Sequence, residues 1–227
     1  LHINLAKYWS YLGHNIDFLL MRRTGSLLNE VPKEINVIDL GAARIRQAII
    51  PIARNIRNIK PDIILSAMWP LTSVTVIAWI LSGKINKLFL SDHVILSLDS
   101  VNNLNVPLLL LKTLIISTYY FSSGIIAVSN GVKKDLCSLG RLPYKKVRVI
   151  YNPVAINVPE NNIKLSCELW GAGHEKRILS VGSLKHEKDY KTLINAIALI
   201  RGSVNIKLII LGEGPLRREL EQLIVSF

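Results

Sequence analysis

The chain has 227 residues, of which 50% are hydrophobic, 19% charged and 7% aromatic, and this excludes a disordered or collagen-like protein. The 28 Lys and Arg residues against 16 Asp and Glu give a net charge of +12, which suits nucleic acid, anionic lipid or phosphorylated ligands as partners. Two cysteines, Cys137 and Cys167, are too few for a disulfide framework and lack metal-ligand spacing. We therefore expect a reducing cytoplasmic compartment and no metal site.

Short apolar runs alternate with helical patterns along the first two thirds of the chain. The runs lack polar alternation, as is typical of strands in parallel sheets that are covered on both faces. Their rhythm predicts a doubly wound α/β sheet. The predicted strands are residues 16–21, 35–38, 63–66, 87–91, 125–128 and 147–150, and the predicted helices are a first one ending at Gly13, then 70–82, 107–121 and 132–139, the last with Ser129 as its N-cap.

Two uncharged stretches, residues 63–83 and 113–132, are long enough to be membrane spans. Residues typical of turns interrupt both stretches: Trp69-Pro70 in the first and Ser122-Ser123-Gly124 in the second. This favours a short strand joined to a helix over a membrane span in each case.

A second strand-and-helix rhythm follows a polar stretch from residue 152 to about 175, which is rich in Asn, Pro, Glu and Gly and is interpreted as a linker. It predicts strands at 177–181 and 206–211 and helices at 189–200 and 215–224, with Pro215 in the first helical position. Only two strand-helix units fit, so this second domain is predicted to be incomplete.

Both units of the second half run from a strand into glycine and then into a helix. Gly182 and Ser183 end the first strand, and Gly212, Glu213 and Gly214 end the second. Glycine lets the backbone approach a ligand closely, and a helix start offers N–H groups and a positive dipole end to phosphate. Lys188 could add a charge to the same phosphate, although a tight structural turn explains these glycines equally well.

His93 directly follows the apolar strand, where ligands bind in open α/β sheets. A solvent-facing or locally bonded histidine is the alternative. The basic residues between Arg44 and Lys60 form either a solvated helix face, which we favour, or a patch for anionic lipid. Aromatic residues do not interleave with these charges, so the sequence predicts no nucleic-acid partner.

Four segments in order along the chain resemble the group 1 glycosyltransferases (family 4) of the GT-B fold. They are residues 125–136 (IIAVSNGVKKDL), 147–154 (VRVIYNPV), 178–189 (ILSVGSLKHEKD) and 208–216 (LIILGEGPL). The resemblance covers essentially the whole chain, and four motifs in sequence are far more specific than any one of them.

The resemblance implies an α/β protein with two Rossmann-like domains, the N-terminal one nearly complete and the C-terminal one only begun. We therefore expect an acceptor-side domain over residues 1–154, a linker over 155–175 and the start of a sugar-nucleotide-binding domain over 176–227. The implied reaction is retaining transfer from a nucleotide-sugar donor to a glycan or lipid-linked acceptor in surface polysaccharide or lipopolysaccharide synthesis. The nucleotide-sugar is a substrate, and neither a cofactor nor a metal is implied. The basic charge would suit a cytoplasmic enzyme that docks on the anionic inner face of the cell membrane.

By the same resemblance, His93 is the catalytic residue near the transferred sugar. Gly182, Ser183 and Lys188 bind the donor diphosphate, and Gly212, Glu213 and Gly214 form a candidate donor-side turn. The chain departs from the family in three ways. Ser183 stands where an arginine is common, the chain begins inside the first helix and so lacks the preceding glycine loop, and it ends before the family's paired acidic residues.

These departures predict a piece of a longer enzyme with negligible activity alone. Two alternatives to a transferase stay open. One is a non-catalytic, basic membrane-binding or scaffold remnant, and the other is a sugar-nucleotide epimerase of the same fold.

Overall fold

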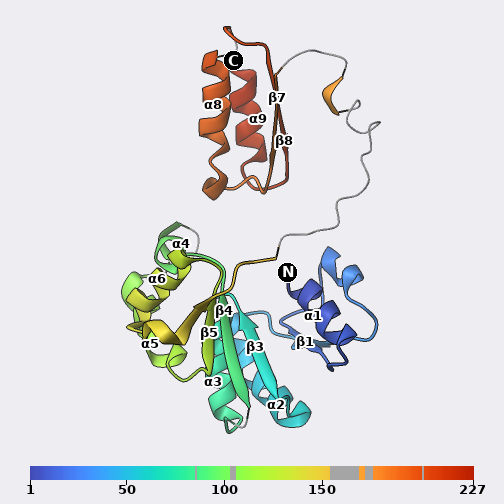
Figure 1. Ribbon diagram of the computed structural model, residues 1–227, viewed down its shortest axis with the longest axis vertical. Helices are drawn as coiled ribbons and strands as arrows, with labels where there is room; N and C mark the ends of the chain where they lie inside the picture. The colour runs from blue at the N-terminus through green and yellow to red at the C-terminus, as the bar shows by residue number, and fades with distance from the viewer. Residues whose placement is uncertain (85, 103–105, 154–168, 172–175, 201) are drawn as a thin grey trace. The chain divides into compact units, whose positions relative to one another are not determined.

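The computed structural model describes residues 1–84, 86–102, 106–153, 169–171, 176–200 and 202–227. The contacts divide the chain into two compact units, Leu1–Val154 and Ala155–Phe227, which we call the N-terminal and C-terminal units (Figure 1). The linker predicted over residues 155–175 lies outside the described residues, apart from 169–171.

The N-terminal unit is built from parallel strands connected by helices. Strands β3, β4, β5 and β6 form one parallel sheet in that order, and β1 pairs in parallel with β2. The strands are β1 (Asp17–Leu20), β2 (Asn36–Asp39), β3 (Ile63–Ala67), β4 (Lys87–Asp92), β5 (Gly124–Ala127) and β6 (Val147–Val149). The helices are α1 (His2–Tyr11), α2 (Ile49–Ile59), α3 (Leu71–Leu81), α4 (Leu96–Asn102), α5 (Leu108–Tyr119) and α6 (Asn130–Gly140), and the 3₁₀ turns are η1 (Ser26–Glu30), η2 (Ile45–Ala48) and η3 (Tyr144–Lys146).

Helices α2, α3, α5 and α6 pack side by side in that order. This follows from the topology, because right-handed crossovers between successive parallel strands bring their connecting helices to one face of the sheet. The core lies between the two layers, where Leu88 and Leu90 of β4 and Ile125 of β5 are almost completely buried, together with Leu111 and Ile115 of α5.

The two long apolar stretches are strand-plus-helix elements, as the sequence predicts. Residues 63–83 form β3 and α3, and residues 113–132 contain the end of α5, all of β5 and the start of α6. Among the described residues, no helix is long and apolar enough to cross a membrane.

The start of α6 confirms a sequence prediction, and its end is one residue beyond the predicted 139. Ser129 Oγ accepts a hydrogen bond from the Val132 N–H at 3.2 Å, so the N-cap is confirmed. Gly140 lies inside the helix, and Arg141 adopts the left-handed conformation that ends it (φ 48°). A Cβ on Gly140 would come within 2.8 Å of Ile115 Cγ2, so the glycine is needed for close packing of α6 on α5.

The C-terminal unit contains two strand-helix units. Strand β7 (Lys176–Val181) pairs in parallel with β8 (Ile206–Leu211), and both helices lie on the same side of the strands (Figure 1). The helices are α8 (Tyr190–Ile200) and α9 (Arg217–Val225), and η4 (His186–Lys188) precedes α8. The last helix begins two residues after the predicted Pro215, because the Leu216 N–H donates to Leu184 O at 3.1 Å and α9 begins at Arg217.

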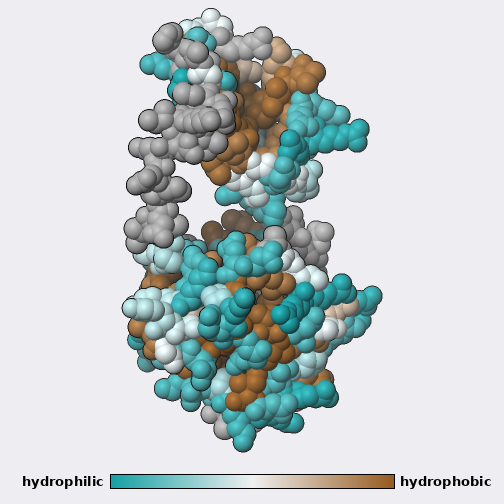
Figure 2. Space-filling model, turned by 90° about the vertical axis from the view of Figure 1, so that its right-hand side faces the viewer, coloured by the Kyte–Doolittle hydropathy of each residue, from teal (hydrophilic) through white to brown (hydrophobic). Residues whose placement is uncertain are grey.

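The core of this second unit is small. Leu184, Tyr190, Ile194 and Leu220 are its buried members. An apolar hollow of about 440 Å³ lies among α8, β8 and α9, and Figure 2 shows apolar side chains reaching the surface of this unit. Two strands and two helices therefore make only part of a layered α/β domain.

Candidate functional site

His93 lies at the carboxyl end of the central sheet of the N-terminal unit, directly after β4. Its Nε2 atom is hydrogen-bonded to Ser91 Oγ at 3.1 Å. Burial of the ring lowers the pKa of His93 below its usual value. The lowered pKa favours the neutral imidazole, which can accept or donate one hydrogen bond to a ligand.

A second histidine, His2 of α1, faces His93. The two ring centroids are 5.5 Å apart, and the rings are inclined by 57°. Burial first and then the charge of His93 lower the pKa of His2. Sequence reasoning found no partner for His2, because 91 positions separate two residues that only the tertiary fold brings together.

A buried carboxyl group, Asp92, precedes His93 and was also missed. Tyr119 Oη donates to Asp92 Oδ2 at 2.8 Å, and the Trp69 N–H donates to Asp92 Oδ1 at 3.2 Å. Thr72 Oγ1 lies 2.7 Å from Tyr119 Oη and extends the network into α3. Burial raises the pKa of Asp92 to about 6, although both hydrogen bonds act in the opposite direction.

This network holds the turn between β3 and α3 against the end of β4. Besides the contact of Trp69 with Asp92, the Met68 N–H donates to Ser91 O at 2.9 Å. Met68 has a positive φ of 66°, which is uncommon for a residue with a side chain. Asp92 therefore positions the backbone on both sides of the His93 site. An aspartate at the end of a buried strand was the available sequence signal.

In the C-terminal unit, the structure brings Gly182 and Lys188 together. A Cβ at position 182 would lie 3.5 Å from Lys188 Cε and 2.9 Å from Tyr190 Oη, so the glycine leaves room for both side chains. Ser183 is exposed beside them. Lys188 directly precedes Asp189 and the start of α8, where free N–H groups favour an anion. The predicted phosphate-binding residues thus share one turn.

The second glycine turn has a structural explanation. A Cβ on Gly212 would come within 1.9 Å of Gly182 O, and a Cβ on Gly214 would come within 2.5 Å of Leu184 O. The backbones of the two turns are also hydrogen-bonded, through Gly182 N–H to Leu211 O at 3.0 Å and Leu184 N–H to Glu213 O at 2.9 Å. Gly212 and Gly214 are therefore required for the close packing of one turn on the other.

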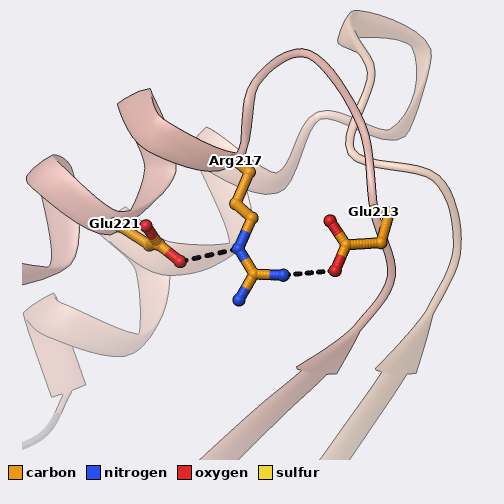
Figure 3. A network of polar contacts seen from close by, with 3 residues as sticks. All are labelled: Glu213, Arg217 and Glu221. Carbon is orange, nitrogen blue, oxygen red and sulfur yellow. Dashed lines mark hydrogen bonds and ion pairs between the residues drawn. The ribbon is translucent and has the colours of Figure 1, made fainter.

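The side chain of Glu213 is occupied by an ion pair. Arg217 of α9 contacts Glu213 through its Nη1 atom and Glu221 through its Nε atom, the latter at 2.8 Å (Figure 3). The hydrogen bond to Glu221 and the charge of Glu213 raise the pKa of Arg217. Glu213 is thus tied to the first residue of α9 by an ion pair with Arg217, which the sequence analysis did not single out.

Comparison with protein families identifies both units. The model of glycosyltransferase family 4 matches residues 3–158, and the model of glycosyl transferases group 1 matches residues 168–226. The chain belongs to glycosyltransferase family 4. The resemblance of its four motifs to this family is thereby confirmed.

Curated relatives of this glycosyltransferase chain match it over part of their length. An uncharacterized glycosyltransferase of Methanocaldococcus jannaschii is 40% identical over 112 residues, which are 46% of this chain and 28% of that protein. The N-acetylgalactosamine-N,N'-diacetylbacillosaminyl-diphospho-undecaprenol 4-alpha-N-acetylgalactosaminyltransferase of Campylobacter jejuni is 37% identical over 123 residues, 54% of this chain and 32% of that protein. The matched region thus spans about a third of each relative.

Solved structures share the fold. HepE of Anabaena in complex with UDP-glucose has a TM-score of 0.72 at 19% identity, covering 92% of this chain and 57% of that one. The lipopolysaccharide outer core galactosyltransferase WaaB has a TM-score of 0.58 at 19% identity, covering 92% and 55%. These similarities confirm the predicted GT-B architecture, with a Rossmann-like N-terminal domain and a partial C-terminal one. The roles of His93, Gly182, Ser183 and Lys188 in this glycosyltransferase stay predictions.

Proposed function

We propose that this chain is the acceptor-side domain and the first part of the donor-binding domain of a retaining glycosyltransferase. The donor is a nucleotide-sugar, and the acceptor is a glycan or a lipid-linked glycan used in surface polysaccharide or lipopolysaccharide synthesis. The proposal rests mainly on one observation, the placement of Lys188 over Gly182 at the turn that leads into α8.

That turn has the features that a diphosphate requires. Lys188 is exposed and forms no ion pair with any described residue, so its ammonium group is available to an anion. Charge grows on the diphosphate as the glycosidic bond to the sugar breaks, and a lysine held at this position stabilises it. HepE, which has the same fold, was solved with UDP-glucose, and this supports a uridine diphosphate sugar as the donor.

His93 is the proposed catalytic residue of the acceptor-side domain. A neutral imidazole, held by Ser91, can hydrogen-bond a hydroxyl of the transferred sugar without adding a charge. We propose that no metal ion or cofactor takes part, as the family resemblance implies.

The acceptor proposal is supported by the relative from Campylobacter jejuni, whose name specifies a diphospho-undecaprenol acceptor. We propose that this chain likewise works in the cytoplasm, on the inner face of the cell membrane, with no nucleic-acid partner. The net charge of +12 favours attraction to an anionic lipid surface.

Binding of UDP and UDP-glucose to the full 227-residue chain, measured by calorimetry, tests the donor site. We expect Lys188→Ala to weaken binding by about tenfold, which corresponds to the loss of one charge-assisted hydrogen bond. Lys191→Ala is the matched control, because Lys191 lies in the first turn of α8, three residues after Lys188, and is paired with Glu219. Equal affinities of wild type and Lys188→Ala would refute the assignment of Lys188.

Transfer itself is tested with the complete glycosyltransferase that contains this chain and with a prenyl-diphosphate-linked glycan as the acceptor, and the anomeric configuration of the product is read by NMR. An inverted product would refute the retaining mechanism. A changed sugar on the nucleotide in the absence of any acceptor would instead identify an epimerase. Vesicle binding without any affinity for a nucleotide-sugar would identify a scaffold protein.

A further inference from the structure

Helix α5 is apolar on its outer side as well as on its inner side. Its inner residues Leu111 and Ile115 are completely buried in the core. On the opposite side, Leu109 is 78% exposed and Ile116 is 42% exposed. Lys112 is the one charged residue in the sequence of this helix. A surface helix normally presents charged and polar residues to water, so an apolar outer side indicates that something else covers it.

The outer residues form a continuous strip, which we call the α5 outer face. It consists of Leu109, Lys112, Thr113 and Ile116, together with Tyr120 directly after the helix. The spacing of three or four residues puts them on one side of an α-helix. Because α5 packs between α3 and α6, this strip lies in the middle of the helical layer and not at its edge.

Lysines surround the aromatic end of the α5 outer face. Lys146 Nζ lies 4.9 Å from the centre of the Tyr120 ring, and Lys84 Nζ lies 4.8 Å from the centre of the Phe121 ring. Tyr120 is 63% exposed and Phe121 is 47% exposed. Within the described residues, no carboxylate lies within 4.0 Å of Lys84, Lys112 or Lys146. Positive charge therefore flanks an apolar and aromatic strip.

The net charge of the chain is concentrated in the same unit. Residues 1–154 contain 18 Lys and Arg against 8 Asp and Glu, a net charge of +10, whereas residues 155–227 contain 10 against 8. Two copies of the N-terminal unit would repel one another across this face. An anionic surface would be attracted to it, and the exposed aliphatic side chains of Leu109 and Ile116 favour a lipid surface over a nucleic acid.

We propose that the α5 outer face docks on a bilayer that contains anionic phospholipids, with the helix lying in the plane of the interface. Leu109 and Ile116 enter the acyl region, Tyr120 and Phe121 occupy the headgroup level, and the three lysines contact lipid phosphates. The inference deepens the proposed function by naming the surface that meets the membrane. The role of this surface rests on the proposed function, in which the acceptor is lipid-linked. The vesicle-binding test of the surface does not depend on that acceptor.

The test is co-sedimentation of the full chain with vesicles made of equal parts phosphatidylcholine and phosphatidylglycerol. We expect the double variant Leu109→Ser/Ile116→Ser to lower the partition coefficient by roughly tenfold or more, because it removes two buried aliphatic side chains from the interface. Ile50→Ser on α2 and Leu199→Ser on α8 are controls, because these residues are 59% and 86% exposed on helices outside the proposed surface. Both controls should bind like the wild type.

A second variant tests the charges. Replacing Lys84, Lys112 and Lys146 with Gln should reduce binding by roughly fivefold for each lysine and should flatten its dependence on salt. Circular dichroism of each variant verifies that the fold is retained.

Several results would overturn the proposal. They are a wild-type chain that stays in the supernatant, a double variant that sediments fully, and a loss of binding confined to Ile50→Ser. A wild-type dimer that becomes monomeric in the double variant would instead assign this face to self-association. Nucleotide binding is measured without vesicles, so failure of the donor site and failure of this surface give separate results.

Discussion

Replacing Asp92 with Asn should stabilise the N-terminal unit near neutral pH. The pKa of about 6 in the folded protein lies above the ordinary 3.8, so the folded chain holds more protons than the unfolded chain between these values. The free energy of unfolding therefore falls as the pH rises through this interval. At about 1.4 kcal/mol per pKa unit, the free energy of unfolding lost over the whole titration of Asp92 is about 3 kcal/mol. About 2 kcal/mol of it falls between about pH 4.5 and about pH 7.5.

Asparagine keeps the geometry of the site. Its carbonyl oxygen can still accept from the Trp69 N–H, and its amide can donate to Tyr119 Oη, which then donates to Thr72 Oγ1. The variant thus removes the buried charge and retains the hydrogen bonds. This separates the cost of the charge from the contribution of the network.

Urea unfolding followed by tryptophan fluorescence measures the effect, since three of the four tryptophans lie in residues 1–154. The informative quantity is the difference between Asp92→Asn and wild type at each pH. Other groups contribute with the opposite sign, because the lowered pKa values of His2 and His93 make stability rise with pH. A difference that stays constant across this range, or a variant that is less stable at about pH 7, would refute the reasoning.

Two further predictions concern the turns and the histidine pair. Gly212→Ala should unfold the C-terminal unit, because its Cβ would come within 1.9 Å of Gly182 O. The control Gly202→Ala places its Cβ in open space, with nothing within 4 Å, and should melt like the wild type when followed by circular dichroism. Equal melting curves for the two variants would contradict the proposed packing of the turns. His93→Gln should raise the pKa of His2 in an NMR titration, because the charge of His93 no longer opposes protonation of His2; an unchanged or lower pKa would show that the rings do not interact.

Much of the fold could be predicted from the residues because strands and helices leave local patterns. The apolar runs at β3, β4, β5 and β8 were found within one or two residues of their observed bounds. The helix α9 was also found within two residues, and its start is displaced from Pro215 to Arg217 by a hydrogen bond from Leu216 to Leu184. Such a contact between two turns has no local signal.

The candidate site was only partly predictable. His93 and Lys188 could be proposed as site residues because each follows a strand or precedes a helix in a recognisable motif, and their roles stay predictions. His2 and the Asp92–Tyr119 network were missed, because their partners lie far away along the chain. The side chain at position 119 reads as one more apolar residue of a helix until its hydroxyl group meets a buried carboxylate.

The sequence by itself determined the class of fold, the parallel arrangement of the strands, the family and the positions at which strands run into glycine turns. These properties follow from local periodicity and from short motifs, in which neighbouring residues carry the information. Tertiary structure alone decided that Asp92 is buried and that His2 faces His93. It also decided that Gly212 and Gly214 serve packing and that α5 shows an apolar side to solvent. Burial and contacts between distant residues set these properties, because the desolvation of a charge or the space for a Cβ depends on atoms from every neighbouring element.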